Sequence, residues 1–396
     1  MKKLLIFLII ILILSGVAYF VFFNQEENST DSLPNFFPLG AIRDIFNDST
    51  NDPVNQIDDD SLIESSKTRK IVATAVAGFD LINLNNRQSL IYTDKNTGHI
   101  YLLDLNSTNT EATRISNITI AGIIDSVFNQ DNEYLYTFIK DQVGRISLIK
   151  IPLSGLLSGD NATQNNSNML SLPTISPDGN KIFFFELFND GVLGILANPD
   201  LSERQIIWKS NITHWQSKWI DNQTIAINQP SSYYLSNNLY FLDIKTKTTK
   251  KILDNKKGLT SLTSPDKKYI FYTQSEGDNL TNIIKNTTTE TEVILGIKTL
   301  ADKCTWTTKN LILLYCAVSD DIFLGQYPDD WYQGKTGFTN DDIWGYIPED
   351  NKLFRFVNLD TNIDIDKFNI YQSDFKDILI FRNKKDLNLW TLELTD

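Results

Sequence analysis

Short apolar segments separated by polar turns dominate the chain after residue 68. They are rich in Ile, Phe, Tyr and Thr, as in Ile182–Phe185 and Ile270–Tyr272, and no sustained helical periodicity interrupts them. Runs of about four to eight β-branched and aromatic residues between turn residues are typical of strands. The pattern therefore predicts an all-β domain over residues 68–396.

The polar turns recur at a regular spacing, which indicates an internal repeat. Successive turns are 45, 47, 43, 45, 42 and 66 residues apart. The aligned positions are Asn86, Asp131, Asp178, Asp221, Asp266, Thr308 and Asp374. One strand later a second apolar pattern recurs, at Ile100–Leu105, Ile146–Ile151, Leu239–Ile244 and Leu389–Leu394. A four-stranded unit of about 40–45 residues is a propeller blade. Seven turns predict a seven-bladed β-propeller, with eight blades or a β-sandwich as alternatives.

Both ends of the predicted domain carry strands that could close the ring. The chain stops at Asp396, just after the third strand of the last repeat, so the last blade lacks an outer strand. The segment Lys70–Ala77 is a spare strand ahead of the first repeat. Pairing the two would complete that blade and remove an open sheet edge.

The chain opens with an apolar segment of 20 residues, Leu4–Phe23. At ~1.5 Å per residue a helix of this length spans ~30 Å, the thickness of the hydrocarbon core of a bilayer. Lys2 and Lys3 precede it, which places the N-terminus in the cytoplasm and the propeller outside the cell membrane. A cleaved signal peptide is the alternative, because Gly16–Ala18 offers a weak cleavage site.

The residues between this segment and the propeller are rich in Asn, Asp, Ser and Glu. Such a composition buries too little apolar area to offset the entropy of ordering. The predicted organisation is a transmembrane signal anchor at residues 1–23, a flexible linker at 24–67 and a propeller at 68–396.

The net charge of −13 bears on the choice of partner. An acidic surface repels phosphate backbones, and no stripe of Lys and Arg interleaved with aromatic residues is present, so we expect no nucleic-acid partner. The membrane, contacted through Leu4–Phe23, is the expected partner at the N-terminus. No motif points to a cofactor.

Two of the turns read Ser176-Pro177-Asp178 and Ser264-Pro265-Asp266, and with the aromatic strands that follow they resemble TolB-type and WD-repeat-like propellers. Other segments resemble a group of uncharacterised bacterial proteins that combine one membrane helix with a propeller. These segments are Val76–Gly78, Thr97–Tyr101, Lys303–Trp306, Tyr315–Val318 and Pro328–Gly334. The resemblance implies a fold and a location. It implies no activity, so no catalytic residue is assigned.

Cys304 and Cys316 are the two cysteines of the chain and lie symmetrically about Asn310, where a hairpin turn is expected. Facing positions on paired antiparallel strands bring the Cβ atoms to ~4.5–5.5 Å, close enough for a disulfide after slight adjustment. Export would expose them to oxidising conditions. We predict a disulfide, with two buried thiols as the alternative, and no metal site, because further soft ligands are missing nearby.

The long spacing between Thr308 and Asp374 indicates an insertion between Val318 and Asn340. Long loops in compact domains are usually functional or disordered. The candidate binding residues of the insertion are Asp329, Asp330, Trp331 and Tyr332. In the alternative interpretation, the two aromatic residues plug the end of the propeller and only stabilise it.

His214 and Trp215 are further candidate binding residues, because they lie at the entry to a first strand, near the expected opening of the channel. A structural role is the simpler interpretation for His214 and for the other histidine, His99.

The favoured function is a binding or scaffold module for a protein, peptide or glycan, since rigid blades with variable loops suit that role. One alternative is a propeller-type glycoside hydrolase or lyase acting on an external polysaccharide, and another is a structural envelope protein. Three carboxylates with perturbed pKa values converging at the channel mouth would favour the enzyme.

Overall fold

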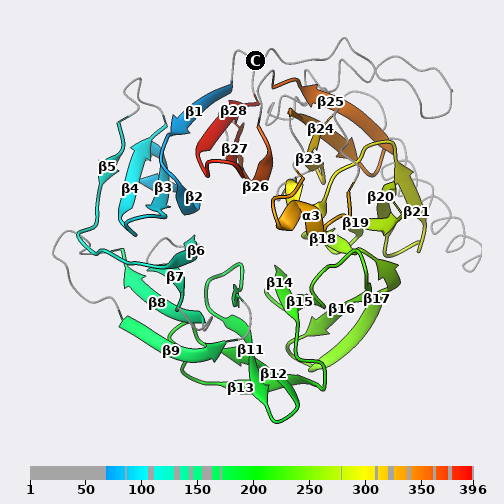
Figure 1. The fold of residues 1–396 in the computed structure, drawn as a ribbon, viewed down its shortest axis with the longest axis horizontal. Coiled ribbons are helices and arrows are strands. Elements are labelled where there is room, and N and C mark those ends of the chain that lie inside the picture. Colours follow the sequence, from blue (N-terminus) through cyan, green and yellow to red (C-terminus); the bar gives the residue numbers. More distant parts are fainter. Residues whose placement is uncertain are drawn as a thin grey trace, which may run out of the picture. The chain divides into compact units, whose positions relative to one another are not determined.

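The computed structural model describes residues 68–394, except residues 85–86, 106–110, 129–133, 142–145, 154–162, 170–171, 278, 308–310, 320–324, 337–339, 360–362 and 373–376. The strands form antiparallel sheets arranged as blades around a central axis (Figure 1). The predicted all-β, seven-bladed propeller is confirmed. The predicted anchor Leu4–Phe23 and the linker lie outside the described residues. Within the described part, no helix is long and apolar enough to cross a membrane.

The first three blades run from the left of the ring to its bottom in Figure 1. Blade 1 contains β2 (Val76–Leu84), β3 (Arg87–Asp94), β4 (Ile100–Asp104) and β5 (Thr113–Arg114). Blade 2 contains β6 (Ile123–Phe128), β7 (Tyr134–Lys140), β8 (Ile146–Pro152) and β9 (Thr163–Met169). Blade 3 contains β10 (Thr174–Ile175), β11 (Ile182–Phe188), β12 (Gly191–Ala197) and β13 (Gln205–Ser210). A pairing of Met169 with Glu186 joins blades 2 and 3 into one continuous sheet.

The other four blades complete the ring. Blade 4 contains β14 (Gln216–Asp221), β15 (Thr224–Asn228), β16 (Ser236–Asp243) and β17 (Thr248–Lys257). Blade 5 contains β18 (Thr260–Thr263), β19 (Tyr269–Glu276), β20 (Asn279–Asn286) and β21 (Glu292–Leu295). Blade 6 contains β22 (Cys304–Trp306), β23 (Leu314–Ser319), β24 (Asp341–Ile347) and β25 (Lys352–Val357). Blade 7 contains β26 (Ile365–Gln372), β27 (Asp377–Asn383) and β28 (Leu389–Glu393).

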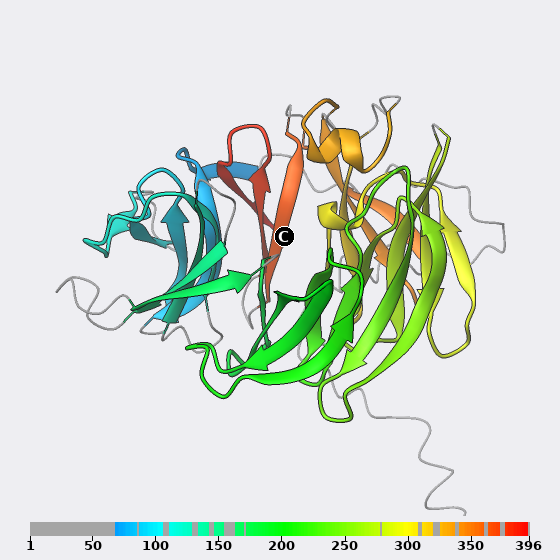
Figure 2. The ribbon, with the colours of Figure 1, turned by 60° about the horizontal axis from the view of Figure 1, so that its bottom comes forward.

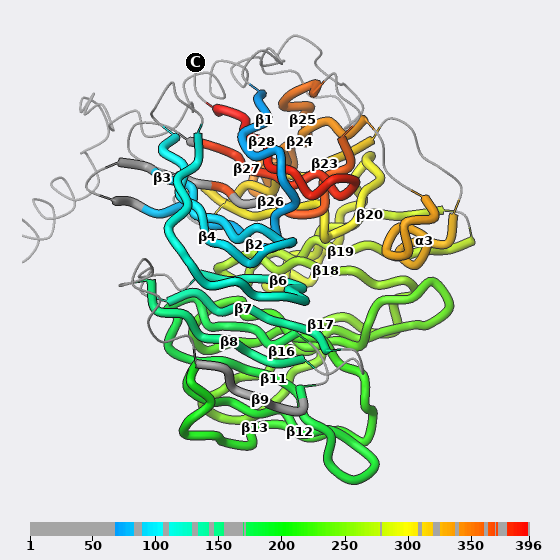
Figure 3. Tube along the Cα trace, turned by 60° about the vertical axis from the view of Figure 1, so that its left-hand side comes forward, coloured from blue at the N-terminus to red at the C-terminus, as the bar shows by residue number. Residues whose placement is uncertain are grey.

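The N-terminal strand β1 (Thr68–Val72) supplies the missing outer strand of blade 7. It pairs antiparallel with β28, Thr68 opposite Leu392 and Val72 opposite Leu389, and the two strands run side by side in Figure 3. Closure of the ring by its two ends is therefore confirmed. The predicted bounds of the spare strand, Lys70–Ala77, were wrong. The chain leaves blade 7 after Val72, and Val76 already begins the innermost strand of blade 1.

Of the aligned turn residues, the three that the structure describes, Asp178, Asp221 and Asp266, lie where the first strand of a blade leads into the second. The two Ser-Pro-Asp turns use the same hydrogen bonds, in which Ser176 Oγ donates to Asp178 Oδ1 at 2.6 Å and Ser264 Oγ donates to Asp266 Oδ1 at 2.5 Å. A short polar side chain that bonds locally favours a tight turn. The two Ser-Pro-Asp turns of the sequence repeat thus form the same local hydrogen bond from serine to aspartate.

Apolar side chains fill the space between adjacent blades. Phe183 and Phe185 of blade 3 share one core cluster with Trp219 of blade 4. The Trp219 ring also donates from Nε1 to the Thr174 carbonyl at 3.0 Å, and Trp306 donates likewise to the Leu262 carbonyl at 3.1 Å. Each tryptophan therefore fastens its innermost strand to the innermost strand of the preceding blade.

The strand order defines two faces of the ring. Connections between second and third strands, and connections from one blade to the next, share one face. The short helix α3 (Asp329–Tyr332) belongs to the connection between β23 and β24 and lies at one rim of the ring in Figure 2. We call this the α3 face.

Candidate functional site

A cavity of about 470 Å³ opens among the innermost strands on the α3 face. Its walls come from blades 3 to 6, mainly from β14, β18 and the 3-10 turn η4 (Ala301–Lys303). The lining residues are Leu172, Gln216, Ser217, Lys218, Asn228, Ser231, Thr260, Ser261, Ala301, Asp302 and Tyr332. This volume is within the range of about 300–1,000 Å³ that is usual for small-ligand sites. The lining is mostly polar, so the cavity suits a hydrophilic ligand.

Lys218 and Asp302 bring opposite charges into this cavity. Lys218 projects from β14, and within the described part of the chain it forms no ion pair. Burial lowers the pKa of Lys218, while Asp302 opposes this effect. Burial likewise raises the pKa of Asp302. Both side chains border the cavity and keep exposed surface there.

Tyr332 closes the cavity from α3. Its hydroxyl donates a hydrogen bond to Asp302 Oδ2 at 2.9 Å, and 45% of its surface stays exposed. Burial and the Asp302 carboxylate raise the pKa of the phenol well above its usual range, so it stays protonated and keeps donating. One predicted residue of the insertion therefore faces the cavity.

Trp331, the next predicted residue, points away from solvent and is 3% exposed. It packs with Leu280, Leu300 and Tyr327, and its Nε1 donates to Asp364 Oδ1 at 3.2 Å. The ammonium of Lys384 lies 3.6 Å from the centre of the indole ring. Trp331 thus anchors the insertion to the propeller, as the alternative interpretation of this loop proposed, while Tyr332 does not share that role.

The two carboxylates of the insertion hold its backbone. Asp330 Oδ2 accepts from the Gln326 amide at 2.8 Å, and Lys335 lies 3.6 Å from Asp330 Oδ1. Asp329 accepts from the backbone amide of Tyr233 in blade 4. The binding role predicted for these two residues stays a prediction, since both already have partners within the fold.

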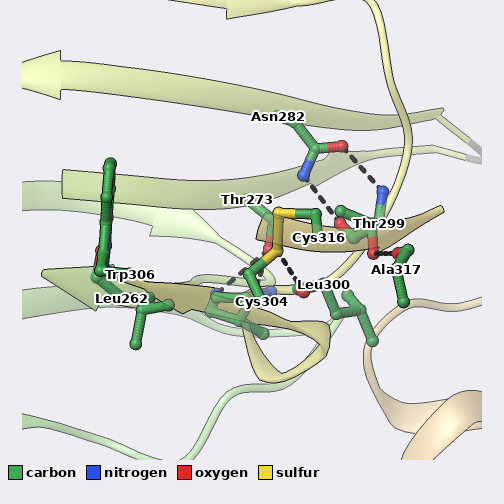
Figure 4. Close-up of a disulfide and its surroundings, with 11 residues drawn as sticks. Leu262, Thr273, Asn282, Thr299, Leu300, Cys304, Trp306, Cys316 and Ala317 are labelled. Carbon is green, nitrogen blue, oxygen red and sulfur yellow. Dashed lines mark hydrogen bonds between the residues drawn. A yellow bond between two sulfur atoms is a disulfide. The ribbon is translucent and has the colours of Figure 1, made fainter. Parts of the chain in front are cut away.

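The disulfide fixes the wall that carries Asp302. Cys304 lies opposite Cys316 in the pairing of β22 with β23, and the two are bonded with their Cα atoms 4.1 Å apart (Figure 4). The predicted disulfide is therefore confirmed. Just before η4, the side-chain amide of Asn282 both donates to and accepts from the Thr299 backbone, at 2.7 and 2.9 Å. Asp302 is thus held between two rigid points.

A second group of charges lies beneath the cavity wall. Lys303 is fully buried, and its Nζ lies 2.6 Å from Asp341 Oδ2 and 2.7 Å from Asp364 Oδ1. These carboxylates neutralise the lysine and do not line the cavity, whose only acidic lining residue in the described part is Asp302. The three converging carboxylates that would favour an enzyme are therefore not found among the described residues.

The adjacent residues His214 and Trp215 lie in different environments. The indole of Trp215 is buried between blades 3 and 4, edge-on to Trp208 with ring centroids 4.7 Å apart. His214 is exposed, and its Nδ1 lies 2.9 Å from Thr213 Oγ1. Neither residue lines the cavity, although Gln216 directly after them does.

Sequence reasoning missed Lys218 and Asp302. The sequence could have indicated Lys218, because it is a charged residue on a predicted innermost strand and stands next to the buried Trp219. Asp302 had no such signal, because the 3-10 turn that orients it follows no strand or helix period.

Exposed apolar residues gather on the same face as the cavity. Among the large apolar residues described as exposed, those at or beside the connections of the α3 face are Leu172, Leu187, Phe188, Ile212, Tyr234, Leu235 and Tyr332. The other two, Ile206 and Ile294, lie on outermost strands. Two of the residues on the α3 face, Leu172 and Tyr332, also line the cavity.

The fold and the cavity together define the class of protein. It is a seven-bladed β-propeller with a polar cavity on one face. No protein-family model matches the chain, and no curated protein is similar to it in sequence. Among solved structures it is similar to an oligogalacturonate lyase from Vibrio parahaemolyticus, with a TM-score of 0.57 and 10% identity over 86% of this chain and 96% of that one.

Two further similarities concern longer proteins. Prolyl endopeptidases match with a TM-score of 0.52 and 10% identity over 79% of this chain and 47% of theirs. TolB from Acinetobacter baumannii matches with a TM-score of 0.41 and 12% identity over 74% of this chain and 59% of that one. The solved structures that match thus include TolB proteins. At these identities the likeness shows the fold alone.

Proposed function

We propose that this chain is a membrane-anchored, extracytoplasmic binding module that takes a polar glycan or peptide ligand on the α3 face. The observation that carries the proposal is the placement of the cavity. A polar cavity of ligand size and most of the exposed apolar residues lie on one face of the ring. The opposite face presents the tight turns within the blades.

Two features support the location. The sequence of Leu4–Phe23 has the length and flanking charges of a single-pass anchor with the propeller outside. The Cys304–Cys316 disulfide fits an exported domain, because disulfides persist in oxidising compartments and are rare in the cytosol.

An enzyme acting on a polysaccharide is the second candidate, supported by Lys218, whose pKa burial lowers, beside Asp302 and the Tyr332 phenol. A lysine with a lowered pKa can serve as a general base. Binding is preferred, because a hydrolase needs two suitably spaced carboxyl groups and the described cavity lining offers one.

Arrays of glycans and of short peptides test the proposal, with the detergent-solubilised full-length protein as the probe. The pocket variant is Lys218→Met, and the matched control is Lys245→Met, an exposed lysine in a turn of the opposite face. We expect ligands that the wild type and the control bind and the pocket variant does not. Binding that all three proteins share, or no binding at all, would overturn the proposal. Chain cleavage of a bound glycan during the assay would favour the enzyme.

A further inference from the structure

We infer that the α3-face cavity recognises a zwitterionic ligand, in which Lys218 binds a carboxylate and Asp302 binds an ammonium group, as in a short peptide with free termini. This inference rests on the proposed function and adds to it the chemical class of the ligand.

Lys218 provides the cation for the carboxylate. Its side chain borders the cavity, and among the described residues no carboxylate lies within salt-bridge distance of it. The lysine nearby, Lys367, disfavours its charge and is itself paired with Asp125 at 3.2 Å across the innermost strands. A carboxylate of a ligand in the cavity would give this ammonium group a charged hydrogen-bond partner.

Asp302 provides the anion for the ammonium group. The side chain accepts from Tyr332 through Oδ2, and no lysine or arginine in the described part forms a salt bridge with it. Its backbone is fixed, because Ala301 N donates to Thr260 Oγ1 at 3.0 Å and Lys303 N donates to the Leu300 carbonyl at 2.9 Å. A carboxylate on a fixed backbone segment at the cavity wall binds an ammonium group at lower entropic cost than a mobile one.

The two charges attract each other across the cavity without forming a salt bridge. Both residues line the same cavity of about 470 Å³, which is large enough for a ligand that contacts both. A ligand with one charge would leave either the lysine or the aspartate unpaired, whereas a zwitterion satisfies both and adds no net charge to the site. Most of the remaining lining consists of hydroxyl and amide side chains, which suit the backbone of a peptide.

The test uses trialanine with free termini, the same peptide amidated at its C-terminus, and the same peptide acetylated at its N-terminus. Binding to the full-length protein in detergent is measured by ligand-observed NMR titration. The pocket variants are Lys218→Met and Asp302→Asn. The controls are Lys245→Met and Asp350→Asn, both exposed in turns of the opposite face.

We expect each blocked terminus to weaken binding to the wild type by about 10- to 100-fold, the effect of one hydrogen-bonded charge. Amidation of the peptide should cause no further loss of affinity for the Lys218→Met variant. Acetylation of the peptide should cause no further loss of affinity for the Asp302→Asn variant. The two controls should bind like the wild type. Such non-additivity would assign each terminus to its partner.

Three outcomes would overturn the inference. These are a Kd for free trialanine weaker than about 10 mM, equal binding of blocked and free peptides, and binding that needs the carboxylate but not the ammonium group. The last outcome would indicate an anionic ligand. If trialanine fails while an array ligand still binds in a Lys218-dependent manner, this inference falls and the proposed function stands. If neither Lys218→Met nor Asp302→Asn changes the binding of any ligand, both this inference and the proposed function are overturned.

Discussion

Asp302 and Lys303 are consecutive residues whose side chains enter opposite environments. Asp302 borders the cavity of the α3 face, and Lys303 is fully buried between Asp341 and Asp364. One short 3-10 turn therefore joins the candidate ligand site to a charged group in the core. The stability of that group and the geometry of the site can be tested through the same few residues.

Replacing Lys303 with Met should destabilise the domain by about 3–5 kcal/mol, because it leaves two buried carboxylates without their cation. Urea unfolding of the full-length protein, followed by tryptophan fluorescence, would measure the loss. The triple variant Lys303→Met, Asp341→Asn, Asp364→Asn should recover much of it, since the buried charges are then gone. A single variant as stable as the wild type would contradict this account of the group.

The stability contributed by Asp341 should depend on pH. Burial raises the pKa of Asp341 from 3.8 to about 6, against the opposing effect of Lys303. The folded state thus keeps a proton that the unfolded chain has already lost. This contribution is fully present below pH about 4 and is lost as the pH rises through about 6.

The wild type should therefore lose stability relative to Asp341→Asn over that interval. The difference in unfolding free energy between the two proteins should change by at most about 1.4 kcal/mol per pH unit. Urea unfolding at a series of pH values measures it. Asp350→Asn, an exposed substitution, serves as the control and should run parallel to the wild type. A stability difference between wild type and Asp341→Asn that stays constant with pH would show that Asp341 titrates normally.

Removing the disulfide should cost stability and loosen the cavity wall. The two cysteines are 12 residues apart, and closing such a loop is worth about 2–3 kcal/mol in the chain-entropy estimate. We expect the double variant Cys304→Ser, Cys316→Ser to lose about 2–3 kcal/mol of unfolding free energy and so to unfold at a lower urea concentration. Non-reducing peptide mapping of the wild type should find the two cysteines in one linked fragment, and two alkylated thiols there would refute the bond.

Deleting residues 68–72 should open the ring, because β28 loses its outer partner. The melting temperature should fall by at least about 5 °C, since several backbone hydrogen bonds and the packing of Ile71 and Val72 are lost. Deletion of residues 55–59, which removes the same length from the predicted linker, is the matched control. Equal melting temperatures for the two deletions would mean that β1 does not hold the ring closed.

The two aromatic residues of the insertion should behave differently. Trp331→Ala should destabilise the domain by about 3–5 kcal/mol, because a fully packed indole leaves a cavity. Tyr332→Phe removes a hydroxyl at the cavity edge and should cost about 1 kcal/mol or less. Thermal unfolding of both variants would check this difference. Similar losses would mean that the whole insertion acts as packing.

The sequence predicted the repeat well because each turn is a local feature. The bonds within Ser176–Asp178 and Ser264–Asp266 depend on adjacent residues, so the motif alone reveals them. The disulfide could be predicted for the same reason, since Cys304 and Cys316 face each other across one hairpin. The spare strand was identified correctly but extended too far, because Lys70–Ala77 continues as β-prone residues across a change of blade.

The site was harder to predict, because it depends on contacts between distant segments. Lys218 comes from blade 4, Asp302 from the connection between blades 5 and 6, and Tyr332 from blade 6, and no sequence period relates them. Trp331 and Tyr332 are adjacent and chemically alike, yet one is buried and the other borders the cavity. Only the path of the folded insertion decides which of the two meets a ligand.

The pairing of β1 with β28 also determines when blade 7 can be completed during synthesis of the chain. Thr68 and Leu392 are partners separated by 324 positions in the sequence. At roughly 5–20 residues per second, the ribosome makes the second about 16–65 s after the first. During that interval β1 has no native partner, whereas each inner blade can form as soon as its own four strands are made. Until the last blade is made, β1 therefore has to be kept from pairing with other strand edges.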